Sequence, residues 1–275
     1  MSISTVFAPD AELDPAQPDL VLISADNVFF YVHTYRVSLI STNSFASLLP
    51  PKTAATPASM TIPTSATAPT SSADVLNIVL HSVYGLPCTH LCPSIPTLRA
   101  SFPALEKYGI PPSTHEPLHV LLRAAAPATP LDVYALAAAH DIAPVAMAAS
   151  PYLLSLALST LSEAQAREIG PRYLLKLIQL HTNRTDTFKR LLLAPPKGHV
   201  PTPRCEEQQQ RGLARAWMLV AAQLAWDVNP STSTHEIQVA FRRIADSLTC
   251  RQCAECLHTR VQELVTDWAG VKRTI

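Results

Sequence analysis

The chain has 275 residues, which suffices for one large domain or two small ones. Its 21 basic and 21 acidic residues give a formal net charge of zero, and charged residues make up 15% of the chain against about 25% in typical soluble domains. This neutrality disfavours a nucleic-acid partner, because phosphate backbones attract basic surfaces. The chain has only six glycines and contains neither a GxGxxG nor a GxxxxGK[ST] pattern, so nucleotide-binding loops are not expected.

The first residues do not read as a targeting signal. Residues 1–20 contain prolines and acidic residues but neither a cationic start nor an apolar run, and we expect residues 1–16 to be disordered. No apolar stretch reaches the roughly 18 residues that a membrane-spanning helix needs. We therefore expect an intracellular protein, nuclear or cytoplasmic, that has no membrane partner. In that compartment cysteines are free thiols or metal ligands rather than disulfides.

The first structural unit is predicted to start with a β-hairpin. Residues 19–24 and 28–32 are two β-prone runs, and the turn residues Ala25-Asp26-Asn27 separate them. Apolar residues between Val37 and Leu49 follow at roughly helical spacing, and Pro50-Pro51 stops the predicted helix, because proline lacks the amide hydrogen and clashes with the preceding turn.

A low-complexity insertion follows at residues 50–72. It consists almost entirely of Pro, Ala, Ser and Thr, a composition typical of mobile segments. A short strand at residues 60–62 would supply the third strand of the hairpin sheet.

The remainder of the chain is predicted to be helical. Residues 75–84 are apolar nearly all round, which indicates a buried helix, and Gly85 marks its end. Short helices that start at prolines follow from residue 130, and Ser162 with Gln165 has the spacing of a capping box. A longer helix runs from Tyr173 towards Leu193, and a proline-rich connection leads to Cys205.

The last seventy residues are predicted to form three helices, each with one apolar face. Their apolar residues recur at intervals of three and four over 213–224, 237–248 and 257–271.

A cysteine cluster lies between the second and third of these helices. Cys250, Cys253 and Cys256 are spaced three residues apart, and His258 follows. A Cys-x2-Cys pair at a turn can bind one tetrahedral zinc ion with Cys250 and Cys253. His258, or Cys256 in its place, is the predicted third ligand, and Cys205 is the predicted fourth. A structural zinc ion is the cofactor that this pattern suggests.

The alternative interpretation is that these cysteines are small buried apolar residues. Cys250 and Cys253 are in phase with Leu257, so a continuous helix would place them on its apolar face. That interpretation leaves Cys256 and His258 unexplained, because they fall off this face. A redox function of the thiols is a third alternative.

A second motif has the form of a zinc-protease sequence. His115-Glu116-Pro117-Leu118-His119 matches HExxH, in which a helix places two histidines one turn apart and a glutamate serves as general base. Pro117 lies inside the motif and Pro111-Pro112 just before it, so a regular helix cannot run through His115. We expect this segment to be a loop or a helix start.

The order of these elements resembles that of a BTB/POZ domain of the fungal type. The resemblance rests on residues 19–23, 29–33, 37–41 with Phe45, 75–80, Tyr84-Gly85 and 133–142. Further on, residues 169–174 and 180–205 resemble the helical extension of fungal BTB-domain proteins. The resemblance implies an α+β fold with a BTB-like domain over 17–160, a helical extension over 161–204 and a C-terminal three-helix unit over 205–275.

The resemblance also implies a function. BTB domains typically form homodimers through the first strand and first helix, which here points to the region of Asp19, His33 and Phe45. Many members present substrates to cullin-type ubiquitin ligases or recruit transcriptional partners. We therefore expect a non-enzymatic, homodimerising adaptor. The alternatives are a zinc-dependent hydrolase that uses residues 115–119 and a zinc-containing transcription factor, which the neutral charge disfavours.

Overall fold

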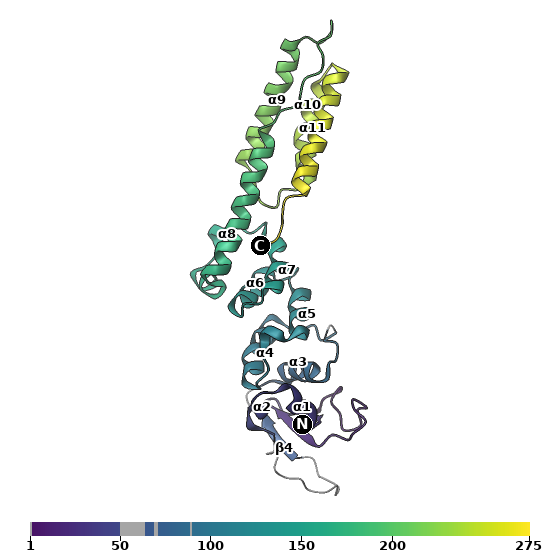
Figure 1. Cartoon of the computed structure of the whole chain (residues 1–275), viewed down its shortest axis with the longest axis vertical. Coiled ribbons are helices and arrows are strands. Elements are labelled where there is room, and N and C mark those ends of the chain that lie inside the picture. Colours follow the sequence, from purple (N-terminus) through teal and green to yellow (C-terminus); the bar gives the residue numbers. More distant parts are fainter. Residues whose placement is uncertain (1, 50–63, 69–70, 89) are drawn as a thin grey trace. The chain divides into compact units, whose positions relative to one another are not determined.

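The protein has an α+β fold that divides into two compact units. The computed structural model describes residues 2–49, 64–68, 71–88 and 90–275. One unit comprises Met1–Ala149 and the other Ser150–Ile275, and Figure 1 traces the elements of each. The division therefore falls earlier than the boundary expected at residue 160. The strands of the described residues belong to the first unit, and the second is helical.

A small mixed sheet forms the core of the N-terminal unit. β2 (Leu20–Ser24) and β3 (Val28–Val32) form the predicted antiparallel hairpin, with Leu20 opposite Val32. β4 (Thr64–Ala68) pairs with β2 in parallel, so the strand order is β1-β3-β2-β4. The strand expected at residues 60–62 lies outside the described residues. β4, which adds the third strand to the hairpin on the side of β2, begins at Thr64.

The N-terminal segment is part of the folded unit, contrary to the predicted disorder of residues 1–16. β1 (Ser2–Ile3) pairs in parallel with β3. Phe7 is fully buried, and its ring contacts those of Phe30, His81 and Tyr84. Disorder was predicted from the composition of this segment, but the burial of its one aromatic residue, Phe7, orders the chain around it.

The helix expected over residues 37–49 is split into two elements. α1 covers Thr34–Ile40, and α2 (Ser44–Ser47) is a turn with left-handed backbone at Phe45 and Ala46. The reason is local competition for hydrogen bonds. The Ser41 hydroxyl accepts from the Phe45 N–H, and the Asn43 side chain accepts from the Ala46 N–H, so the helical pattern is interrupted.

The described part of the N-terminal unit contains five further helices. They are α3 (Ala73–Tyr84), α4 (Ile95–Lys107), α5 (Glu116–Ala125), α6 (Pro130–Ala139) and α7 (Ala143–Ala149), with a 3-10 turn at Pro112–Thr114. Gly85 adopts φ +66° and ends α3 as predicted. No helix was predicted over α4, although Ser94 caps it by accepting from the Thr97 N–H. α5 begins at Glu116, in the segment expected to be a loop or a helix start.

The C-terminal unit contains the three predicted helices and a long fourth one. α8 (Glu163–Leu192) starts at the predicted capping box and is kinked at Gly170, which has φ +72°. 3-10 turns at Ser150–Leu153 and Leu158–Thr160 precede α8, and α9 (Glu207–Trp226), α10 (Thr234–Ser247) and α11 (Arg251–Ala269) follow it.

Aromatic residues from α8 and the last three helices form one shared core. Trp217 of α9 stacks on Phe241 of α10 with ring centroids 4.1 Å apart, and Phe188 of α8 contacts Trp268 of α11. α8, which precedes the boundary expected at residue 204, therefore shares its core with the three helices that follow that boundary. None of the helices within the described residues is long and apolar enough to cross a membrane.

Candidate metal centre

Four cysteine and histidine side chains converge beside the N-terminal end of α11. They belong to His199, Cys205, Cys250 and Cys253, and one ligand atom from each lies within 4.8 Å of all the others. The three cysteines are those predicted from the sequence. His199 was not predicted, and it takes the place assigned to His258 or Cys256.

The start of α11 positions two of the thiols. Cys250 is the N-cap residue and Cys253 lies in the first turn, so the two side chains share one side of the helix end. Cys253 is 3% exposed and belongs to the same apolar core as Leu257. The alternative interpretation expected an apolar face of this helix, and Cys253 lies on such a face. The same face therefore directs the Cys253 thiol towards the cluster.

A tight turn presents the third thiol. Thr202 and Cys205 exchange backbone hydrogen bonds of 2.9 and 3.0 Å, which closes the chain over Pro203-Arg204. Cys205 is 2% exposed, and α9 starts two residues later. Its Sγ atom lies 3.5 Å from the Sγ atom of Cys253.

His199 directs one ring nitrogen at the thiols and the other at the backbone. Its Nε2 atom lies 3.4 Å from the Sγ atoms of both Cys250 and Cys253. Its Nδ1 atom lies 2.8 Å from the carbonyl oxygen of Val200. A carbonyl oxygen only accepts hydrogen bonds, so Nδ1 carries the proton and the lone pair of Nε2 faces the thiols.

The three thiols differ in acidity because their surroundings differ. The Cys253 backbone N–H lowers the pKa of Cys250 to about 7, whereas burial raises the pKa of Cys253 to about 12. Burial also raises the pKa of Cys205. A cation placed among the sulfur atoms would favour their thiolate forms, because a metal-bound thiol loses its proton.

His258 and Cys256 lie apart from the cluster, which corrects the predicted ligand set. His258 is five positions after Cys253 and therefore on a different side of α11, where it lines a hollow with Phe241 and Arg242 of α10. Cys256 lines another hollow, to which His199 also contributes, but it does not belong to the four-residue group. The predicted histidine, His258, follows the Cys-x2-Cys pair, whereas the histidine of the cluster, His199, precedes Cys205.

The HExxH segment does not form a helical zinc motif. His115 is the N-cap residue of α5, and its Nδ1 atom accepts a hydrogen bond from the Leu118 N–H at 3.1 Å. His119 is in the helix, and its Nε2 atom bonds the Pro112 carbonyl oxygen at 3.0 Å. Both rings are used to hold the helix start, and burial lowers the pKa of His115 to about 4.

Two of the three predicted partner-contact residues are buried. His33 is 2% exposed and bonds the Tyr84 hydroxyl at 2.7 Å, and Phe45 is fully buried and stacks on Tyr108. Asp19 is exposed and accepts a hydrogen bond from the Thr34 N–H at the start of α1. His33 and Phe45 therefore pack inside the unit, and the prediction that their region contacts a partner stays a prediction.

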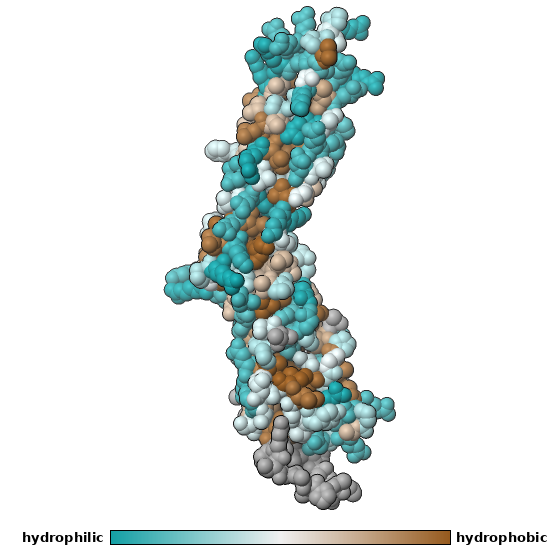
Figure 2. All heavy atoms as spheres, in the orientation of Figure 1, coloured by the Kyte–Doolittle hydropathy of each residue, from teal (hydrophilic) through white to brown (hydrophobic). Residues whose placement is uncertain are grey.

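Other apolar side chains of the same region do face solvent. On α1, Leu39 is 77% exposed and Tyr35 is 46% exposed, and Ile3 of β1 is 52% exposed. Figure 2 shows hydrophobic side chains on the visible face of the N-terminal unit, near the position of α1 in Figure 1. Tyr35 and Leu39 belong to the first helix, one of the two elements to which the resemblance pointed.

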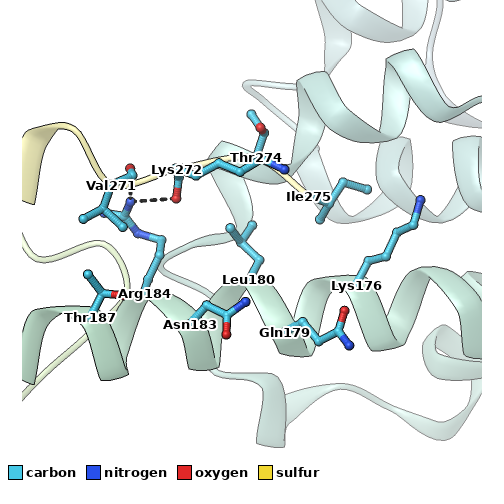
Figure 3. A pocket seen from close by; sticks show the side chains of 10 residues that line it. All are labelled: Lys176, Gln179, Leu180, Asn183, Arg184, Thr187, Val271, Lys272, Thr274 and Ile275. Atoms are coloured by element: carbon cyan, nitrogen blue, oxygen red, sulfur yellow. Dashed lines mark hydrogen bonds between the residues drawn. The ribbon is translucent and has the colours of Figure 1, made fainter. Parts of the chain in front are cut away.

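A buried arginine organises the C-terminal segment of the chain. Arg184 is 4% exposed and donates to the carbonyl oxygens of Pro230, Val271 and Lys272 at 2.7 to 3.0 Å. Figure 3 shows it reaching the last residues from α8, beside a hollow that Lys176 also lines. Burial lowers its pKa to about 10. Carbonyl dipoles compensate its charge, so we assign this residue a structural role.

Comparisons with known proteins found no matching family model, no matching curated protein and no matching solved structure.

Proposed function

We propose that the protein is a non-enzymatic interaction protein whose N-terminal unit is BTB/POZ-like and forms a homodimer. The sheet topology is the observation that supports this proposal best. An antiparallel hairpin, β2 and β3, is followed by α1 and α2 and then by β4, which returns to pair in parallel with β2. This is the position in which the resemblance requires a third strand.

The state of the titratable groups favours recognition over catalysis. The histidines of the HExxH segment bond to backbone groups at the start of α5, and Glu116 pairs with Arg123. A metal held there would require His115 to give up its hydrogen bond, because a neutral imidazole that binds a metal through one nitrogen carries its proton on the other and cannot accept from the Leu118 N–H. An adaptor needs no such rearrangement.

The proposed partner of the N-terminal unit is a second copy of this chain. In a two-fold dimer each surface meets itself, so exposed apolar residues on one element can cover one another without a complementary charge. Leu39 and Tyr35 on α1 and Ile3 on the edge strand β1 supply such residues. Tyr35 and Leu39 belong to the first helix, through which the resemblance implies dimerisation, and Ile3 belongs to β1, which lies outside the residues that carry the resemblance.

The C-terminal unit has a core of its own. In the adaptor proposal one unit self-associates while other surfaces recruit a partner, for which a cullin scaffold or a transcriptional regulator is the class implied by the resemblance.

Light scattering on the full chain, coupled to size-exclusion chromatography, tests the dimer. We expect twice the chain mass for the wild type and one chain mass for Leu39→Glu, because a buried carboxylate opposite its own copy is unfavourable. Leu219→Glu is the matched control, since Leu219 of α9 is 74% exposed in the other unit. A monomeric wild type, or a dimer that persists in Leu39→Glu, contradicts the proposal.

A further inference from the structure

We propose that His199, Cys205, Cys250 and Cys253 bind one zinc ion in a closed structural site of the C-terminal unit. The proposal stands independently of the dimer, because all four residues belong to one unit of one chain.

The donor set selects the metal. Three thiols and one imidazole are soft or borderline ligands, which bind zinc well and are poor ligands for magnesium or calcium. None of the four side chains has an oxygen atom, the ligand that magnesium and calcium prefer. A Cys3His set is among the common structural zinc sites.

The distances agree with tetrahedral coordination. Zinc–sulfur bonds of about 2.3 Å and zinc–nitrogen bonds of about 2.0 to 2.1 Å place two sulfurs about 3.8 Å apart, and a sulfur and a nitrogen about 3.5 Å apart. The observed values are 3.5 Å between Cys205 and Cys253 and 3.4 Å from His199 to each of Cys250 and Cys253. The other three pairs of ligand atoms lie within 4.8 Å of one another, so the four side chains can close around one ion.

The hydrogen bond of His199 prepares it for this role. A histidine that binds a metal usually donates its other ring N–H to a carbonyl or carboxylate, which fixes the tautomer and the ring orientation. The Nδ1 atom of His199 makes this bond to the Val200 carbonyl oxygen at 2.8 Å. Its free Nε2 lone pair thus faces the sulfur atoms of Cys250 and Cys253.

Four protein ligands leave no position for an exchangeable water, which distinguishes a structural from a catalytic zinc ion. The ion would join the segment that leads from α8 to α9, through His199 and Cys205, to the start of α11, through Cys250 and Cys253. This segment contains four prolines between Ala194 and Cys205 and no helix, so few backbone hydrogen bonds hold it. The metal would supply the missing anchor.

A disulfide is the competing explanation for the proximity of Cys205 and Cys253. It would account for two of the four residues and would leave the orientation of His199 and the position of Cys250 unexplained. The experiment below separates the two explanations.

The test uses the full chain without a histidine tag, purified under reducing conditions. Elemental analysis should give one zinc per chain, and substitution with cobalt(II) should produce the intense thiolate-to-cobalt absorption of a tetrahedral thiolate site. We expect each of Cys205→Ser, Cys250→Ser, Cys253→Ser and His199→Ala to weaken metal binding at least tenfold. Cys256→Ser and His258→Ala are the matched controls on α11 and should bind as the wild type does.

Two kinds of result would overturn the proposal. One is a wild type that binds neither zinc nor cobalt. If titration of that protein also finds two thiols fewer than the six cysteines, a Cys205–Cys253 disulfide explains their proximity instead. The other is loss of binding in His258→Ala together with full binding in His199→Ala. Because His199 is only partly buried and lies outside the helices, its alanine variant keeps the test interpretable if a cysteine variant fails to fold.

Discussion

The Nε2 atom of His199 lies 3.4 Å from the Sγ atom of Cys253, although the two residues are 54 positions apart in the chain. This contact joins the proline-rich connection after α8 to the first turn of α11. His199 does not belong to the shared helical core, so the apolar packing of that core does not fix the position of its side chain. The contact with Cys253 does.

Removal of the metal should loosen one part of the C-terminal unit selectively. After treatment with a chelator we expect faster amide hydrogen exchange over residues 199–205 and 250–256, because both segments lose their common anchor. The helices around Trp217 and Phe241 should keep their protection, since their stacked rings lie in the apolar core. Unchanged exchange at the two segments would contradict this expectation.

Trp217 should contribute to stability through both its ring and its N–H group. It is fully buried, stacks on Phe241 and donates from Nε1 to the Leu192 carbonyl oxygen at 2.9 Å. Trp217→Phe removes the donor and leaves a small cavity, for which we expect a loss of about 1 to 3 kcal/mol in the free energy of unfolding. Urea denaturation measures this loss. Trp226→Phe is the control, because Trp226 is 89% exposed and should change little.

Arg184 should hold the C-terminal segment against α8. Arg184→Met removes donors to three carbonyl oxygens and the contact of the guanidinium with the Trp268 ring, whose centroid is 4.2 Å away. Charged hydrogen bonds are each worth about 1.5 to 3 kcal/mol, and methionine retains part of the apolar packing, so we expect a loss of about 2 to 4 kcal/mol in unfolding free energy.

The same Arg184 variant should expose residues 271–275 to limited proteolysis. Lys189→Met on the same helix is the control, because Lys189 is exposed. Equal stability of the two variants would show that the buried guanidinium is dispensable.

His115 should make the N-terminal unit less stable in acid. Burial lowers its folded pKa to about 4 from an ordinary value of 6.5, so the unfolded chain binds more protons between these values and stability falls as the pH falls through that window. At pH 5 the contribution amounts to about 2 kcal/mol relative to pH 7.5. Asparagine at this position cannot titrate but keeps an acceptor for the Leu118 N–H.

Denaturation followed by circular dichroism at pH 7.5 and pH 5 measures the effect. We expect His115→Asn to lose less stability than the wild type between the two pH values. His235→Asn at an exposed position of the other unit is the control. An identical pH dependence of wild type and His115→Asn would refute the assignment.

Local patterns sufficed to predict many of the elements. The hairpin β2–β3, the end of α3 at Gly85, the capping box of α8 and the three last helices all depend on residues close in sequence. Hydrophobic periodicity and capping record such interactions directly.

The misplaced features depend on interactions that periodicity does not contain. Side chains of Ser41 and Asn43 bond the backbone and end α1 early, although the apolar spacing continues. Phe7 orders a segment of disordered composition because partners from β3 and α3 enclose it. Phe45 belongs to the apolar pattern of residues 37–49, but its stacking on Tyr108 joins elements distant in the chain, which the pattern does not contain.

The candidate metal centre was predicted in three of its four residues. The Cys-x2-Cys spacing identified Cys250 and Cys253, and the thiol of Cys205 was the natural fourth candidate. His199 was missed because a turn at residues 202–205 returns the chain towards α11, and no short-range pattern encodes that return. His258 was chosen for its sequence proximity, which on a helix places it on another side.

Native mass spectrometry of the full chain tests the central claim most directly, because one spectrum reports the number of chains and the bound metal mass. We expect an assembly of two chains that carries two zinc ions. A single chain without zinc would contradict both proposals. A dimer without metal would remove the zinc site, and a monomer with one zinc ion would remove the homodimer.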